Sequence, residues 1–113
     1  MGTRGKTIMN QAEMMENACE AVKLLKSLSH PSRLMILCQL AEGEKTVGDL
    51  QQHSHLSQSA FSQHLGRLRK QKWVKARKEG LYVYYSIADA KVAKMLAVLH
   101  EIYCSDSQKG AFK

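Results

Sequence analysis

Apolar residues recur every three or four positions along most of this chain, which is the spacing of helices that bury one face. The repeat is interrupted near Pro31 and Gly43, residue types that are poor in a helix interior. The stretch that begins at Pro31 is apolar on most sides, so we expect it to form the central buried helix. The predicted helices span residues 10–28, 31–41, 46–53, 57–72 and 89–104.

The spacing changes after Gln71, where apolar and polar residues begin to alternate. Alternation is typical of β-strands, and the Glu79-Gly80 pair between two alternating stretches is typical of a tight turn. We therefore predict a two-stranded hairpin over residues 73–87, packed on the helices, with an exposed basic tip at residues 77–80. One face of this hairpin is expected to carry Leu81, Val83, Tyr85 and Ile87.

The helix predicted over residues 57–72 has one narrow apolar stripe, formed by Phe61, Leu65 and Leu68. The rest of its surface carries short polar side chains, which can reach base edges in a major groove, and then cations, which can hold phosphates. Together with the shorter helix before it, it forms a helix-turn-helix pattern, although the turn lacks the usual glycine. The DNA contacts predicted for this helix and the hairpin tip are Ser57, Gln58, Ser59, Ser62, Gln63, His64, Arg67, Arg69, Lys70, Arg77 and Lys78.

Length and charge agree with this interpretation. The chain has 113 residues, enough for one domain, and a formal net charge of +7. Residues 67–78 contain seven cations and no carboxylate, which favours a polyanionic partner. We predict a mainly α winged helix-turn-helix domain with a two-stranded β-wing (α+β) at residues 10–104, between flexible tails at 1–9 and 105–113. The chain contains no apolar run long enough to span a membrane and no signal core, so a cytoplasmic location is expected.

The motifs in this order are similar to those of a known family. The strings SLSHPSRLMIL, VGDLQQHSHLSQSAFSQHLGRLR and VYYSI closely resemble the ArsR/SmtB family of small winged-helix repressors, and the likeness covers roughly residues 18–104. It is greatest for the thiol- and persulfide-sensing branch of BigR, SqrR and HlyU. The resemblance implies a homodimer, joined by the terminal helices, that reads a partly palindromic double-stranded DNA operator as a repressor or anti-repressor.

The metal sites of this family are incomplete in the sequence. The arsenic sensors carry a Cys-Val-Cys motif at the third helix, and residues 44–49 contain no cysteine. The zinc sensors use an Asp-x-His motif and a later His pair, but Asp89 is followed by Ala90 and Lys91, and only His100 remains of the pair. No metal or other cofactor is therefore expected.

The persulfide-sensing branch instead pairs one cysteine of the second helix with one of the last helix, and Cys38 and Cys104 fall on those positions. The resemblance thus implies a switch that responds to reactive sulfur species or oxidant. From the residues alone, Cys38 is more typical of an inert buried cysteine, and it is the match of both cysteines to the family pair that favours the switch. Cys19 matches no motif position and is expected in the core.

Three alternatives remain open at this stage. His100 and Cys104 are one helical turn apart and could share a metal ion, which would make the chain a metal-responsive repressor. A protein-only helical adaptor would bind DNA no better than its charge predicts. A thiol enzyme would need a general base beside an exposed cysteine, and the chain has no peroxidase, reductase or rhodanese motif, so we predict that it is not an enzyme.

Overall fold

The structure, a computed structural model, describes residues 10–104, and the tails predicted at residues 1–9 and 105–113 lie outside that range. The predicted helices are all present, with ends shifted by two residues at most. The elements are α1 (Gln11–Leu28), α2 (Pro31–Leu40), β1 (Lys45–Thr46), α3 (Val47–Gln52), α4 (Gln58–Lys70), β2 (Val74–Glu79), β3 (Tyr82–Ile87) and α5 (Ala90–Cys104).

The helices near the predicted DNA-binding surface begin at residues that cap their free backbone amides. The hydroxyl oxygens of Thr46 and Ser57 each accept the N–H group three residues later, at the starts of α3 and α4. Before α2, the sequence offers Ser29 and His30 as caps, and the structure uses His30. Its Nδ1 atom accepts the N–H of Ser32 at 3.1 Å.

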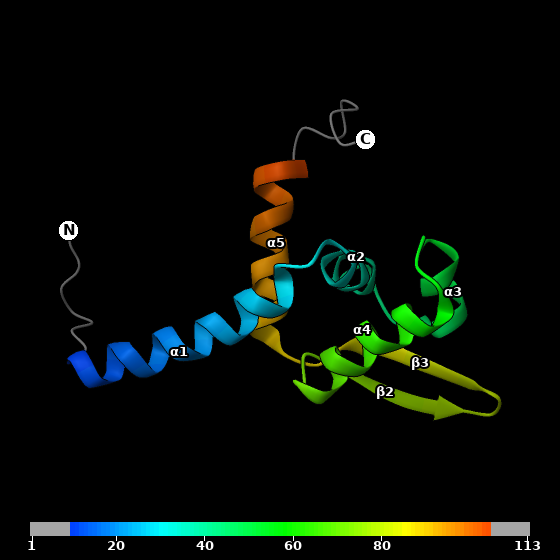
Figure 1. Ribbon diagram of the computed structural model, residues 1–113, viewed down its shortest axis with the longest axis horizontal. Helices are drawn as coiled ribbons and strands as arrows, with labels where there is room; N and C mark the ends of the chain where they lie inside the picture. Colours follow the sequence, from blue (N-terminus) through cyan, green and yellow to red (C-terminus); the bar gives the residue numbers. More distant parts are fainter. Residues whose placement is uncertain (1–9, 105–113) are drawn as a thin grey trace.

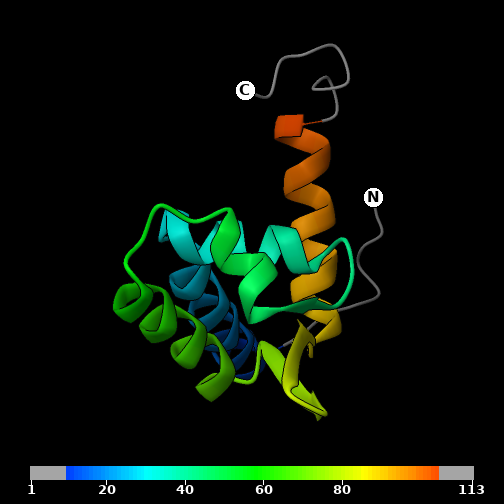
Figure 2. The ribbon, with the colours of Figure 1, turned by 90° about the vertical axis from the view of Figure 1, so that its right-hand side faces the viewer.

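The core lies between the helices and one face of the sheet, with α2 at its centre (Figure 2). The buried stripe of α4, formed by Phe61, Leu65 and Leu68 as predicted, belongs to this core. α2 contributes Ile36, Leu37 and Leu40 to the core, as expected of the central helix, but its apolar residues Met35 and Cys38 are exposed. The largest fully buried side chains come from α2, α3, α4 and α5 and are Leu37, Leu50, Phe61, Leu68 and Val92.

The predicted hairpin is part of a three-stranded antiparallel sheet in the order β1-β3-β2. The extra strand, β1, pairs Lys45 with Tyr85 and Thr46 with Tyr84. The prediction for Leu81 is wrong: its side chain is 97% exposed, because it lies in the turn after Gly80 rather than in a strand. Gly80 has a φ of 62°, a conformation that glycine adopts without strain.

The terminal helices α1 and α5 extend away from this core (Figure 1). Trp73 fixes the C-terminal end of α1, because its Nε1–H donates to the buried Ser27 Oγ at 2.7 Å. The prediction that Cys19 lies in the core is wrong, since its part of α1 projects from the body and is exposed. No helix among the described residues is long and apolar enough to cross a membrane. Exposed large apolar side chains on these two helices are Met14, Met15, Val22, Leu25, Val98, Ile102 and Tyr103.

Candidate DNA-binding surface and thiol pair

Helix α4 presents a polar and basic face opposite its buried stripe. Packing of the stripe against the core fixes the helix, so the other side of α4 points to solvent. Every predicted contact on this helix except His64 is exposed, as are Arg77 and Lys78 on the strand β2 that packs beside α4. The structure therefore brings the predicted polar and cationic residues onto the free surface of one helix and its neighbouring wing, a shape that can enter a DNA groove.

His64 differs from its neighbours on α4 because it is half-buried against the start of α2. Its ring centroid lies 4.3 Å from that of His30, and its Nδ1 atom is buried with no hydrogen-bond partner. Desolvation, followed by the nearby His30, Arg33 and Arg67, lowers the pKa of His64. The imidazole is therefore held neutral in this packing, and its position links α2 to α4.

The wing carries its own ion-pair network. Arg77, predicted as a phosphate contact, donates hydrogen bonds to Glu44 and to Glu79. Hydrogen bonding from Arg77 lowers the pKa of the Glu44 carboxyl, so Glu44 is ionised at neutral pH. Lys78 has no such contact among the described ion pairs and is exposed at the tip.

Cys38 and Cys104 are far apart in the sequence, but the charge of Cys104 acts on Cys38 in the fold. Both thiols are free; Cys38 is on the exposed side of α2, and Cys104 is half-buried at the end of α5. Partial desolvation raises the pKa of Cys38, and the negative charges of Cys104 and Glu42 raise it further.

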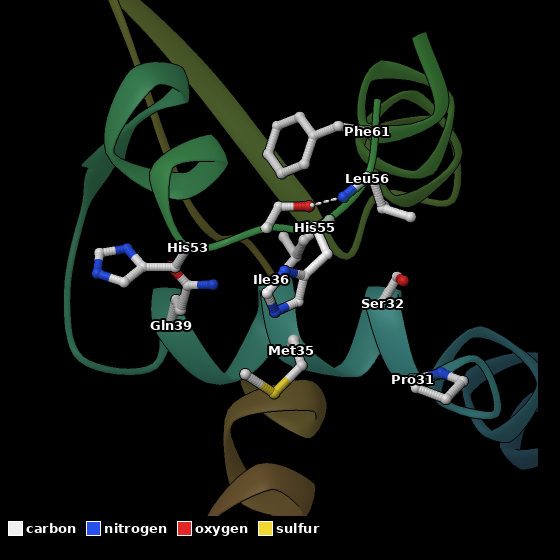
Figure 3. Close-up of a pocket in the computed structure, with 10 residues that line it drawn as sticks. Pro31, Ser32, Met35, Ile36, Gln39, His53, His55, Leu56 and Phe61 are labelled. Carbon is white, nitrogen blue, oxygen red and sulfur yellow. Dashed lines mark hydrogen bonds between the residues drawn. The ribbon is translucent and has the colours of Figure 1, made fainter. Parts of the chain in front are cut away.

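A shallow cavity of about 280 Å³ lies between α2 and the turn from α3 to α4 (Figure 3). Its floor is apolar and its rim carries His53 and His55. The turn is held by the N–H of Leu56, which donates to Ser54 Oγ at 3.0 Å. Sequence reasoning did not find this cavity, because no local pattern marks it. Its lining is Pro31, Ser32, Met35, Ile36, Gln39, His53, Ser54, His55, Leu56 and Phe61.

The metal alternative drew on His100 and Cys104, which lie near the end of α5. Among residues 10–104, no group of three or more His, Cys, Asp or Glu side chains is arranged to hold a metal ion. Closed structural zinc sites use four such ligands, and catalytic sites use three. His100 and Cys104 therefore have no third ligand among the described residues with which to hold a metal ion.

These features together define a winged-helix transcription regulator: a short helix, an exposed basic helix and a β-wing. A sequence profile of the family described as "Bacterial regulatory protein, arsR family" matches residues 30–75. Transcriptional activator HlyU of Vibrio cholerae is 44% identical over 100 residues, which cover 88% of this chain and 93% of that protein. The biofilm growth-associated repressor of Xylella fastidiosa is 39% identical over 101 residues, 89% of each chain. The chain belongs to the ArsR family.

Solved structures give the same answer for the fold. HlyU from Vibrio vulnificus superposes with a TM-score of 0.78 at 45% identity, covering 85% of this chain and 100% of that one. The repressor BigR from Xylella fastidiosa gives a TM-score of 0.76 at 41% identity, over 85% and 98% of the two chains. The winged-helix fold and the family are thus confirmed. The relatives are transcription regulators, which also confirms that the chain is not an enzyme.

Proposed function

We propose that this chain is a cytoplasmic, homodimeric regulator whose affinity for a partly palindromic operator is switched by reactive sulfur species or oxidant. The observation that carries the proposal is that α2 and α5 each carry a free cysteine, Cys38 and Cys104, and that the charge of Cys104 acts on Cys38. A bond between them would tie the second helix to the last one. A relative adds support, since one solved structure is described as reduced HlyU from Vibrio cholerae.

The proposed DNA contacts divide between bases and phosphates. The start of α4 carries the short polar side chains that suit base edges, and its end and the wing carry the cations that suit phosphates. The base-reading candidates are Ser57, Gln58, Ser59, Ser62, Gln63 and His64. The phosphate candidates are Arg67, Arg69, Lys70, Arg77 and Lys78.

The proposed dimer would cover the exposed apolar faces of α1 and α5. The large apolar residues Met15, Leu25 and Ile102 are more than half exposed in the protomer, and exposed apolar surface of this kind can mark an interaction site. A twofold axis would pair the same surface of two copies and would place two α4 helices on one side of the DNA.

The proposed switch is a two-electron oxidation of the thiol pair. One thiolate attacks the outer sulfur of a persulfide or polysulfide, and the S–S bond of that molecule breaks with release of a thiolate. The second cysteine then attacks the new protein persulfide, which forms the disulfide and releases hydrosulfide. With peroxide, the intermediate is a sulfenic acid and the released group is water. Because the pKa of Cys38 is raised, the proposal depends on the pairing of the two thiols rather than on one acidic cysteine.

The test measures binding to an operator duplex selected from random-sequence DNA with the reduced protein. We expect polysulfide or peroxide to shift the affinity by about 5- to 150-fold, the usual range of allosteric coupling, and mass spectrometry to find a Cys38–Cys104 bridge. Cys38→Ser should bind the reduced-state operator normally and lose the response. Cys19→Ser is the matched control and should respond as the wild type does. A response to zinc alone, with both thiols unmodified, would refute the dithiol switch and favour the metal-responsive alternative.

The division between bases and phosphates gives a further expected result. Gln63→Ala should weaken operator binding by about 1–3 kcal/mol, the cost of one lost base contact, and leave binding to random DNA nearly unchanged. Lys78→Ala should weaken binding to the operator and to random DNA equally. It should also reduce the slope of log affinity against log salt concentration by about 0.9, the value for one phosphate contact. Fluorescence anisotropy at several salt concentrations measures both quantities. Equal losses on both duplexes for both variants would contradict this assignment.

A further inference from the structure

Each of the three nitrogen atoms of the Arg77 guanidinium group donates a hydrogen bond to a carboxylate. Its Nε donates to Glu44 Oε2 at 2.7 Å and its Nη2 donates to Glu44 Oε1 at 2.9 Å, which makes a bidentate pair. Its Nη1 donates to Glu79 Oε1 at 2.6 Å. The Cζ atom lies 4.7 Å from the ring centroid of Tyr84, within the range of a cation–π contact.

The strand order explains how these residues meet. Arg77 on β2 lies directly opposite Tyr84 on β3, and Tyr84 lies opposite Thr46 on β1. Glu44 comes just before β1, on the far edge of the sheet from β2. The side chain of Arg77 therefore crosses the central strand, passes over the Tyr84 ring and reaches the turn that follows α2.

The charges of this network oppose contact with DNA. One arginine faces two carboxylates, so the group carries a net charge of −1 on a wing that should approach phosphates. The side chains of Arg77 and Glu79 are 53% and 67% exposed, so a phosphate can reach them from solvent. A phosphate that binds the Nε and Nη2 edge of Arg77 must take the place of the Glu44 carboxylate, which already makes bidentate hydrogen bonds there.

We propose that Glu44, with Glu79, competes with DNA phosphate for Arg77 and thereby limits the affinity of the free wing for DNA. The inference rests on the proposed DNA binding and adds intramolecular competition to it. This competition should not depend on the DNA sequence, because a phosphate contact contributes equally to operator and random DNA. It assigns a function to Glu44, which lies outside the predicted contact surface.

The test is Glu44→Gln, which removes the competing charge and keeps the size of the side chain. We expect binding to a duplex of random sequence to become about 3- to 10-fold tighter at low salt. The plot of log affinity against log salt concentration should steepen by about 0.9, the value for one added phosphate contact. The operator duplex should show the same gain. A melting curve checks that the variant is folded.

Two controls isolate the role of Arg77. Glu42→Gln makes the same change of charge in the same turn, but Glu42 pairs with Lys45 at 3.5 Å rather than with Arg77; we expect no change in the salt slope. In the double variant Glu44→Gln/Arg77→Ala the gain should disappear, because it requires the released cation. A gain that persists there, or that Glu42→Gln reproduces, would refute the competition.

Two other results would also decide the question. Weaker binding by Glu44→Gln, with a folded protein and wild-type binding intact, would mean that the pair only positions the wing, and the competition would be refuted. Failure of the wild-type protein to bind either duplex would overturn the proposed function and this inference with it. The two failures are therefore distinguishable in one set of titrations.

Discussion

Replacing Phe61 by alanine is expected to lower the free energy of unfolding by about 3–5 kcal/mol, the usual cost of removing a buried aromatic side chain from a packed core. Phe61 is 1% exposed, lies near the start of α4 and belongs to the same core as α2 and α5. A small domain has a total stability of about 5–15 kcal/mol, so the variant should lose a large share of it. Equilibrium unfolding in urea, at equal protein concentrations, measures the change.

Ser62→Ala is the matched control for this variant. Ser62 is the next residue of α4 but is exposed, so its removal should change the stability by no more than about 0.5 kcal/mol. Operator binding should weaken in Phe61→Ala, because the apolar stripe holds the polar face of α4 in position. A loss of less than about 1 kcal/mol for Phe61→Ala would contradict the view that this stripe anchors the DNA-binding helix.

The helices were predictable because their signals are local. Apolar spacing gave their faces, and capping residues such as Ser57 gave their starts. β1 was missed because a two-residue strand is too short to show alternation; it exists only through its pairing with β3. The alternation of apolar and polar residues predicted that Leu81 lies in a strand. In the structure it lies in the tight turn between β2 and β3, where the turn geometry rather than the alternation sets its position.

Those parts of the candidate site that come from a single segment of the chain could be predicted from the sequence, and contacts between distant segments could not. The exposed face of α4 follows from a single helical repeat, whereas the partner of Arg77 is 33 residues earlier in the sequence, and a basic block gives no sign of it. The pairing of Cys38 and Cys104 was likewise inaccessible to spacing. The pairing came from the family resemblance and stays a prediction, which the effect of the Cys104 charge on Cys38 supports.

Cys19 shows a different limit of the same reasoning. An apolar repeat indicates which face of a helix is buried, but it does not say whether the buried contact lies within one chain or between two. The repeat in α1 continues past the part that the protomer covers, and Cys19, Val22 and Leu25 are exposed there. The pattern therefore fits the proposed dimer better than it fits a single core.

Ile102→Glu is expected to break the proposed dimer and to weaken operator binding by about 100-fold or more. Ile102 is 64% exposed on α5, and a glutamate there would bury an unpaired charge in an apolar interface, which is strongly unfavourable. A monomer can bind only one half-site, so it loses most of the advantage that a specific site has over random DNA. Analytical ultracentrifugation gives the oligomeric state, and anisotropy titrations give the affinity.

Ala93→Glu introduces the same charge on the opposite side of α5, since nine residues at about 100° each place the two positions half a turn apart. Ala93 is exposed, and this variant should remain dimeric with operator binding within about twofold of the wild type. If Ile102→Glu also stays dimeric, the interface must lie elsewhere on the protomer. If it becomes monomeric but binds the operator normally, dimerisation is not what sets the operator affinity, and the proposed arrangement of two α4 helices on one operator is wrong.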